Sequence, residues 1–168
     1  SIGIFFQSIS CIFALLAAAL LLWVNKERKH SNRLLAFILI IFAAQHLQLI
    51  LLFSSLILKM PALLRVLAPT TFLVAPLAFV YIRSVLNNEL KFRKYDWLMV
   101  IPAILTLINF IPYYILPTNE KIDYLFKNFY NQVKTQDAGR GLLPSIIYYI
   151  IRVCWSGFFL WIGFRLIS

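Results

Sequence analysis

Acidic residues are scarce in this chain, and so are the residues that usually build catalytic or metal sites. The 168 residues include six Asp and Glu residues, two histidines and two cysteines. The histidines, His30 and His46, stand apart, and no nucleophile has an evident partner base. Metal-ligand spacings and phosphate-binding loops are also missing from the sequence. We therefore predict no catalytic residue, no cofactor site and no metal site, and we do not expect an enzyme.

Charged residues of either sign are few, and their scarcity excludes a water-soluble fold. Only 13% of the residues are charged and 62% are hydrophobic, so a soluble domain of this size would have too little polar surface. A transmembrane β-barrel is excluded as well, because its strands alternate apolar and polar residues. Residues 34–42, by contrast, are apolar without interruption. We therefore expect membrane-spanning helices.

The two cysteines, Cys11 and Cys154, lie inside apolar runs rather than in loops. Their spacing does not match a metal site, and nothing in the sequence brings them together. We expect both to be small buried side chains and disfavour a disulfide between them.

Long apolar runs fill most of the chain. They cover residues 2–24, 34–58, 66–86, 97–116 and 143–167. Each run is close to the roughly 20 residues that a spanning helix needs. The sequence thus predicts an all-α, polytopic helical bundle in which residues 1–168 form one membrane domain with five spans. Because the chain starts without Met and stops while still apolar, we expect it to be part of a longer polypeptide.

Basic residues predict the orientation of this bundle. The net charge of +10 could suggest nucleic acid, but the Lys and Arg residues are spread over the loops. They are densest in the first and third loops, at Lys26, Arg28, Lys29 and Arg33, and at Arg83, Lys91, Arg93 and Lys94. By the positive-inside rule these two loops are cytoplasmic. The N-terminus is then outside and the C-terminal end of the segment is cytoplasmic.

Residues 118–136, between the fourth and fifth runs, have the pattern of an amphipathic helix. One face is apolar, with Ile122, Leu125, Phe126, Phe129 and Val133, and the other is polar, with Lys121, Asp123, Lys127, Asn128, Asn131 and Lys134. We expect this helix to lie flat at the outer interface, where it either caps the bundle or senses a ligand; capping is the favoured interpretation. Tyr113 and Tyr114 are expected to be aromatic anchors at the same interface.

Three polar residues interrupt the second run. Gln45, His46 and Gln48 lie near its middle, where the bilayer makes unpartnered polar groups costly. Their spacing allows contacts with two neighbouring helices. His46 could be a ligand contact or a proton acceptor, but interhelical hydrogen bonding of all three is favoured. In the third run, Pro69 and Pro76 remove backbone hydrogen bonds and predict a kink.

Arg152 is the most unusual residue of the fifth run. All six acidic residues fall in predicted loops, so none is available within a span to neutralise its charge. Tyr148, Tyr149 and Trp155 share its helix face and could form cation–π contacts; snorkelling to the outer head groups is an equal alternative. The lack of carboxylates within the runs also disfavours a proton-coupled transporter.

Four segments together resemble a known family. They are Asn25-Lys-Glu-Arg-Lys-His-Ser-Asn-Arg-Leu-Leu35, Pro76-Leu-Ala-Phe-Val-Tyr-Ile-Arg-Ser-Val-Leu86, Tyr95-Asp-Trp-Leu-Met-Val-Ile-Pro102 and Ile111-Pro-Tyr-Tyr-Ile-Leu-Pro117. In order and spacing they are similar to the membrane-embedded amino-terminal region of AraC-type transcriptional regulators of Bacteroidota. The family often has His-Phe-Leu-Pro where this chain has Met99-Val-Ile-Pro102, so a role for that histidine does not transfer. No helix-turn-helix lies within these residues, so this segment itself is not expected to contact nucleic acid.

The resemblance implies a function. It predicts the sensing and anchoring module of a one-component regulator in the bacterial inner membrane, with the lipid bilayer and a protein partner or a second copy as its partners. A cue would bias two packings of the helices near the kinked third span, Gln45, His46 and Arg152. The alternative is a noncatalytic accessory subunit of a larger inner-membrane complex. A small carrier is a third possibility, disfavoured by the missing carboxylates.

Overall fold

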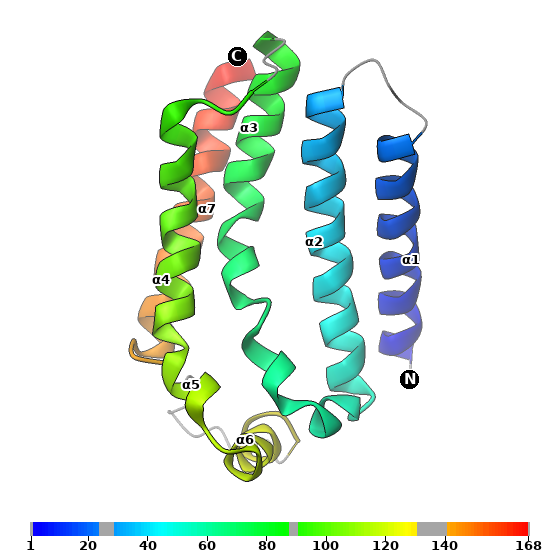
Figure 1. Ribbon diagram of the computed structural model, residues 1–168, viewed down its shortest axis with the longest axis vertical. Helices are drawn as coiled ribbons and strands as arrows, with labels where there is room; N and C mark the ends of the chain where they lie inside the picture. The colour runs from blue at the N-terminus through cyan, green and yellow to red at the C-terminus, as the bar shows by residue number, and fades with distance from the viewer. Residues whose placement is uncertain (1, 24–28, 88–90, 131–140, 168) are drawn as a thin grey trace.

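We analysed a computed structural model, which describes residues 2–23, 29–87, 91–130 and 141–167. Every regular element in these ranges is helical, which confirms the all-α prediction. The longest helices are α1 (Ile2–Trp23), α2 (Lys29–Phe53) and α7 (Ser145–Ile167). The helices α3 (Val74–Asn87) and α4 (Ile101–Asn109) are shorter and run lengthwise beside them (Figure 1).

Four segments in the described part of the chain are long and apolar enough to cross a membrane. They are Ile2–Trp23, His30–Phe53, Pro61–Asn87 and Ser145–Ile167. Their side chains are mostly exposed, as expected for helices whose outer faces contact lipid tails rather than water. The chain therefore has the helices of a multi-pass membrane protein.

The third apolar run does not form one continuous α-helix. A short 3-10 helix, η2 (Pro61–Arg65), precedes it, and the run itself begins with a second one, η3 (Ala68–Phe72), and becomes α-helical only in α3. Pro69 lies in the first turn of η3 and Pro76 in the first turn of α3, where a missing N–H is least costly. The sequence predicted a kink at these prolines, whereas the structure has a longer interruption of the α-helix that runs through η2 and η3. A preceding 3-10 helix, η1 (Leu56–Lys59), joins this segment to α2 as a hairpin.

The fourth apolar run is also divided, into η4 (Lys94–Val100), α4 and α5 (Ile111–Ile115). Pro102 and Pro112 each open a new helix, and the chain breaks at Phe110 between α4 and α5. None of the three pieces is long enough to be counted with the four segments above. The fourth predicted span, residues 97–116, is therefore a series of short helices rather than one helix of spanning length.

The two ends of the bundle differ in the elements they hold. At the C-terminal end lie the start of α2, the ends of α3 and α7, and the start of η4 (Figure 1). Four basic residues are exposed at this end: Arg33 in α2, Lys94 in η4, and Lys91 and Arg93 just before η4. Lys29 is the first residue of α2. Lys26 and Arg28 lie outside the described residues. The first and third basic clusters thus share one end, as the topology prediction requires. We call the opposite end the α6 end.

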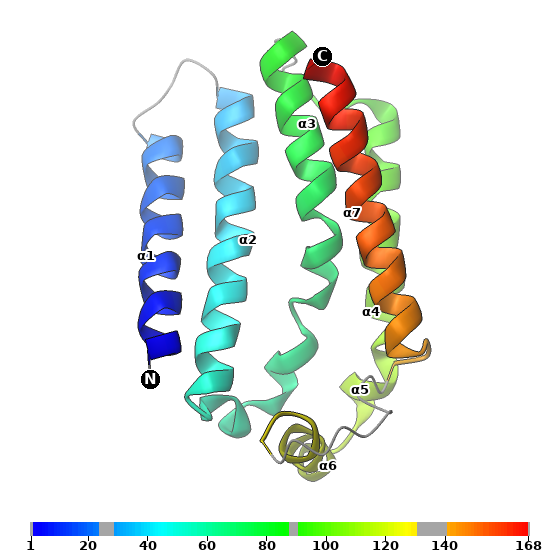
Figure 2. The same cartoon turned by 180° about the vertical axis from the view of Figure 1, so that it is seen from behind.

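The helix α6 (Thr118–Leu125) continues as a π-helical turn, η5 (Phe126–Tyr130). This helix lies across the end of the bundle that is at the bottom of Figures 1 and 2, where it is seen nearly end-on. Residues 131–136 of the predicted amphipathic helix lie outside the described residues. Leu125 of the predicted apolar face is buried, whereas Phe126 and Phe129 of the same face are exposed; Lys121 of the predicted polar face is buried instead. Lys121 faces inward because its Nζ donates to the carbonyl of Tyr114 at 2.9 Å.

Tyrosine hydroxyls hold the interrupted third segment in place. Tyr113 is fully buried and donates to the carbonyl of Pro61 at 2.6 Å, and Tyr114 donates to the carbonyl of Arg65 at 2.9 Å. Such bonds satisfy carbonyls that a 3-10 helix leaves without regular α-helical partners. The expectation that these tyrosines anchor the interface is therefore wrong for Tyr113, which is inside the protein.

Candidate functional site

Gln45 and Gln48 of α2 are directed toward the interrupted third segment. Nε2 of Gln45 donates to Oγ1 of Thr70 at 3.3 Å, within η3. Nε2 of Gln48 donates to the carbonyl of Leu63 at 3.2 Å and also to the carbonyl of Leu64. The 3-10 geometry leaves these carbonyls accessible, so the two amides connect α2 with η2 and η3.

His46 is directed toward α1 instead. Its Nδ1 forms a hydrogen bond with Oε1 of Gln7, and one turn away Sγ of Cys11 donates to the carbonyl of Ala43 at 3.5 Å. The three polar residues of α2 thus contact two neighbouring segments, as their spacing predicts. The geometry separates His46 from the glutamines, so His46 belongs to the α1–α2 contact.

Arg152 lies half-buried on α7, with its guanidinium carbon 5.1 Å from the centre of the Tyr149 ring. The other two aromatic residues predicted beside it have different partners. Tyr148 packs against Phe72 and Phe110, with ring centres 5.6 and 5.4 Å away. Nε1 of Trp155 donates to the carbonyl of Phe72 at 3.1 Å. The indole, rather than Arg152, therefore contacts a carbonyl of the interrupted segment.

Gln45, Gln48 and Arg152 line one cavity of about 410 Å³, which we call the two-arginine cavity. Its lining residues come from α2 and α7, from the interrupted segment and from η5. Its other charged residue is Arg65, at the end of η2, and its wall also includes leucines and Phe129. No Asp or Glu is among the described residues that line it. The sequence predicted three of its polar residues and grouped Gln45 and Arg152 at the third span.

Arg65 was not singled out by the sequence, and the structure places it in the wall of the cavity. Its Nη2 donates to the hydroxyl of Tyr124 in α6 at 2.9 Å, and its guanidinium carbon lies 4.8 Å from the centre of the Phe110 ring. The side chain is only partly exposed. Sequence reasoning missed it because a basic residue next to an apolar run looks like any loop flank. Arg65 links the cavity to α6.

Arg83 and Asp96 form a buried ion pair, which corrects the assignment of both to a loop. Nη1 and Nη2 of Arg83 donate to the two carboxylate oxygens of Asp96 at 2.9 and 2.5 Å. The two residues are 6% and 7% exposed. Burial alone raises the pKa of Asp96, but hydrogen bonds from Arg83 and from the backbone N–H of Arg93, together with the nearby positive charges, hold that pKa below 3.8. The pair fixes η4 against α3.

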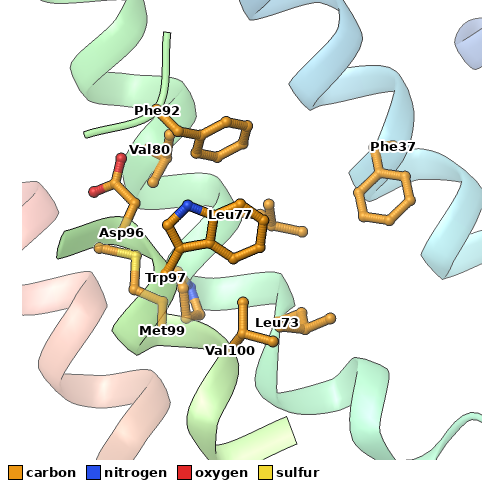
Figure 3. A pocket seen from close by; sticks show the side chains of 10 residues that line it. Phe37, Leu73, Leu77, Val80, Phe92, Asp96, Trp97, Met99 and Val100 are labelled. Atoms are coloured by element: carbon orange, nitrogen blue, oxygen red, sulfur yellow. The ribbon is translucent and has the colours of Figure 1, made fainter. Parts of the chain in front are cut away.

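An apolar groove lies beside this ion pair, with a volume of about 160 Å³. Phe37 of α2 faces Trp97 and Phe92 across it, while the Asp96 carboxylate points away from the groove (Figure 3). Leu77 and Val80 of α3 form its floor. With an almost wholly apolar lining, the groove suits lipid tails and offers no polar group that would select a ligand.

Asn109 positions the start of α7. Its carbonyl accepts from the N–H of Leu142 at 2.9 Å, and its Oδ1 accepts from the N–H of Leu143 at 2.8 Å. A Cβ on Gly141 would lie 2.7 Å from Nδ2 of Asn109, so a glycine is needed for this close approach. The end of α4 thus fixes the helix that carries Arg152.

Both cysteines are free thiols. Cys11 is partly buried, but Cys154 is exposed on α7, so the expectation that both are buried is wrong for Cys154. An exposed cysteine on an apolar helix is compatible with contact with lipid tails.

Comparison with known proteins gives no match: no family model, no curated protein and no solved structure is similar to this chain.

Proposed function

We propose that this chain is the membrane-embedded sensing and anchoring module of a one-component transcriptional regulator, with its DNA-binding part outside these residues. The two-arginine cavity carries the proposal. It brings Gln45 and Gln48 of α2, Arg65 of η2 and Arg152 of α7 around a segment that is not regular α-helix. The resemblance of the loop and proline motifs to AraC-type regulators supplies the kind of output.

The mechanism that we propose is a change in the packing of α7. A cue in the cavity would contact α2, the interrupted segment and α7 together, and would favour the packing in which these contacts are best. The hydrogen bonds of 3-10 helices have poorer geometry than those of α-helices and the pieces are short, so this segment can move at lower cost than a continuous α-helix. Because α7 runs from the cavity to the C-terminal end, its movement would reach whatever follows on that side (Figure 1).

The proposed topology has five crossings in the bacterial inner membrane, the fourth formed by η4, α4 and α5. These pieces cover Lys94–Ile115 with a single break, and α4 runs lengthwise with the long helices (Figure 1). The exposed basic residues at the C-terminal end favour a cytoplasmic location for that end by the positive-inside rule. The α6 end is then outside, with α6 at the outer interface and the exposed Phe126 and Phe129 available to the head-group layer.

The direct test of this function is whether the full polypeptide that contains this segment binds DNA while in the membrane. Cells expressing a tagged full polypeptide are crosslinked, the membrane fraction is isolated, and the DNA held by the tag is sequenced. We expect enrichment of a small set of promoter regions. Recovery of the tagged polypeptide in the membrane without any enriched DNA would contradict the regulator and favour an accessory subunit.

A further inference from the structure

We infer that the apolar groove lined by α2, α3 and η4 holds an acyl chain of an anionic phospholipid, whose head group lies against Lys91 and Lys94. The apolar lining alone would accept any lipid tail, and the basic residues at one end of the groove add selection for negative charge. The binding needs only the membrane location of the chain. It does not depend on the proposed regulator or on the orientation of the bundle.

The groove is elongated along the bundle. Leu77 and Val80 of α3, with Leu73 just before it, are spaced at i, i+4 and i+7 and share one helix face. At 1.5 Å per residue these positions extend over about 10 Å. The lining runs from Phe92 at one end to Leu73 and Val100 at the other (Figure 3). Because α3 lies lengthwise with the long helices, an acyl chain in the groove has the direction of the surrounding lipid tails (Figure 1).

The groove is open to the surroundings of the protein. Phe37, Phe92 and Trp97 line it and are 49%, 50% and 73% exposed. Its volume of about 160 Å³ is close to that of an apolar cavity that holds benzene, roughly 150 Å³. It therefore takes a part of a chain, and the occupant continues outside the groove. Lipid tails meet both conditions and already surround a membrane-spanning protein.

Basic residues gather at the Phe92 end of the groove. The His30 ring at the start of α2 packs against the Phe92 ring, with centres 5.5 Å apart, so this is the C-terminal end of the bundle. Lys91 and Arg93 are the chain neighbours of Phe92, and Lys94 is the first residue of η4. All three are exposed. Each lysine thus stands within two chain positions of a residue that lines the groove.

The positive charge at this end does not require any single residue to be unpaired. Residues 83–96 contain four basic and two acidic residues, so a net charge of +2 remains when all of them are counted. Asp96 is paired with Arg83, and its carboxylate points away from the groove. Basic residues next to a bilayer attract anionic head groups. The exposed Trp97 in the groove wall is a residue type that favours the head-group level.

Contact with lipid is measured on the purified full polypeptide in phosphatidylcholine bilayers that contain a small fraction of a photoreactive lipid. The probes are phosphatidylglycerol and phosphatidylcholine with the same diazirine-bearing acyl chain, and labelled residues are identified by mass spectrometry. We expect phosphatidylglycerol to label the groove at least about fivefold more strongly, because the lysines attract its net negative charge. Phe5 and Phe6, exposed at the start of α1, should be labelled equally by both lipids. Equal labelling of the groove would overturn the inference.

A pair of charge variants locates the head group. Lys91→Gln combined with Lys94→Gln should remove the preference for phosphatidylglycerol in the groove and leave labelling by phosphatidylcholine unchanged. Lys59→Gln combined with Lys127→Gln is the matched control, since it removes the same charge from exposed positions in η1 and η5. A preference that persists without Lys91 and Lys94, or that is lost in the control, would overturn the inference.

A further variant tests the position of the acyl chain. Val100→Trp keeps both lysines and fills the groove, so labelling of Leu77 should fall several-fold with either lipid. Unchanged labelling of Leu77 in this variant would overturn the inference. So would a wild-type protein in which neither lipid labels Leu77, because another protein segment or a second copy would then occupy the groove.

Discussion

At the scale of single residues, a buried ion pair joins two side chains that lie on either side of a loop. Arg83 and Asp96 are separated by 13 positions and look like flanking charges in the sequence, yet they form a bidentate buried pair. Removing one member leaves the other buried without its counter-charge, which is costly in a site this enclosed.

Asp96→Asn should therefore destabilise the protein. Loss of the carboxylate leaves Arg83 buried with a neutral amide, and we expect a loss of about 3 kcal/mol, seen as a lower midpoint of thermal unfolding in detergent. Asp123→Asn is the matched control, because Asp123 is exposed on α6. Equal midpoints for Asp96→Asn and the wild type would show that the pair contributes nothing.

The pH dependence of the same pair follows from the direction of the pKa shift. The pKa of Asp96 lies below 3.8 in the folded protein, so the contribution of the pair is complete above that value and is lost as the pH falls through the lower folded-state pKa. The difference in unfolding midpoint between wild type and Asp96→Asn should be constant from about pH 7 to about pH 5 and shrink below about pH 3. A difference that grows on acidification would contradict the assigned ionic pair.

At the scale of elements, the orientation of α7 depends on the contact between Asn109 and Gly141. Gly141→Ala would place a methyl group 2.7 Å from Nδ2 of Asn109, so either the Asn109 amide or the start of α7 must shift. We expect a loss of about 1–3 kcal/mol in unfolding experiments. Gly157→Ala, within the same helix, has nothing within 4 Å of the added Cβ and should stabilise by about 0.5–1 kcal/mol. If both variants changed stability alike, the close approach would not matter.

The elements also show what hydropathy can and cannot predict. Runs 2–24 and 34–58 became α1 and α2 because an apolar stretch of spanning length has no alternative way to satisfy its backbone in lipid. The third and fourth runs are also apolar but are interrupted. In and just before the third run, backbone carbonyls accept hydrogen bonds from side chains, as Pro61 does from Tyr113 and Phe72 does from Trp155. A hydropathy profile sums the contributions of single side chains and does not include hydrogen bonds between side chains and backbone carbonyls. The prolines were the only visible signal of the interruptions.

The candidate site was predictable in part for the same reason. Gln45, Gln48 and Arg152 stand out because polar residues in a span are costly, so their importance is visible without a structure. That His46 belongs to a different contact, and that Arg65 belongs to the cavity, depends on how α2 and η2 face one another. The spacing of residues in the sequence does not specify how α2 and η2 face one another.

At the scale of the whole molecule, the orientation in the membrane is the next prediction. Single cysteines are placed at Asp123 in α6 and at Lys91 before η4, both exposed, in a background where Cys11 and Cys154 are replaced by Ser. In intact spheroplasts a membrane-impermeant maleimide should label Asp123→Cys, and Lys91→Cys only after lysis. The reverse pattern would invert the proposed topology.

The central claim is that the two-arginine cavity receives the cue that this module passes to its DNA-binding part. The most direct measurement is promoter occupancy by the full polypeptide in cells over a range of growth conditions, for the wild type, Arg33→Gln and Arg152→Gln. The account predicts that occupancy changes between conditions in the wild type and in Arg33→Gln but not in Arg152→Gln. A change in Arg152→Gln as large as that in the wild type would contradict it.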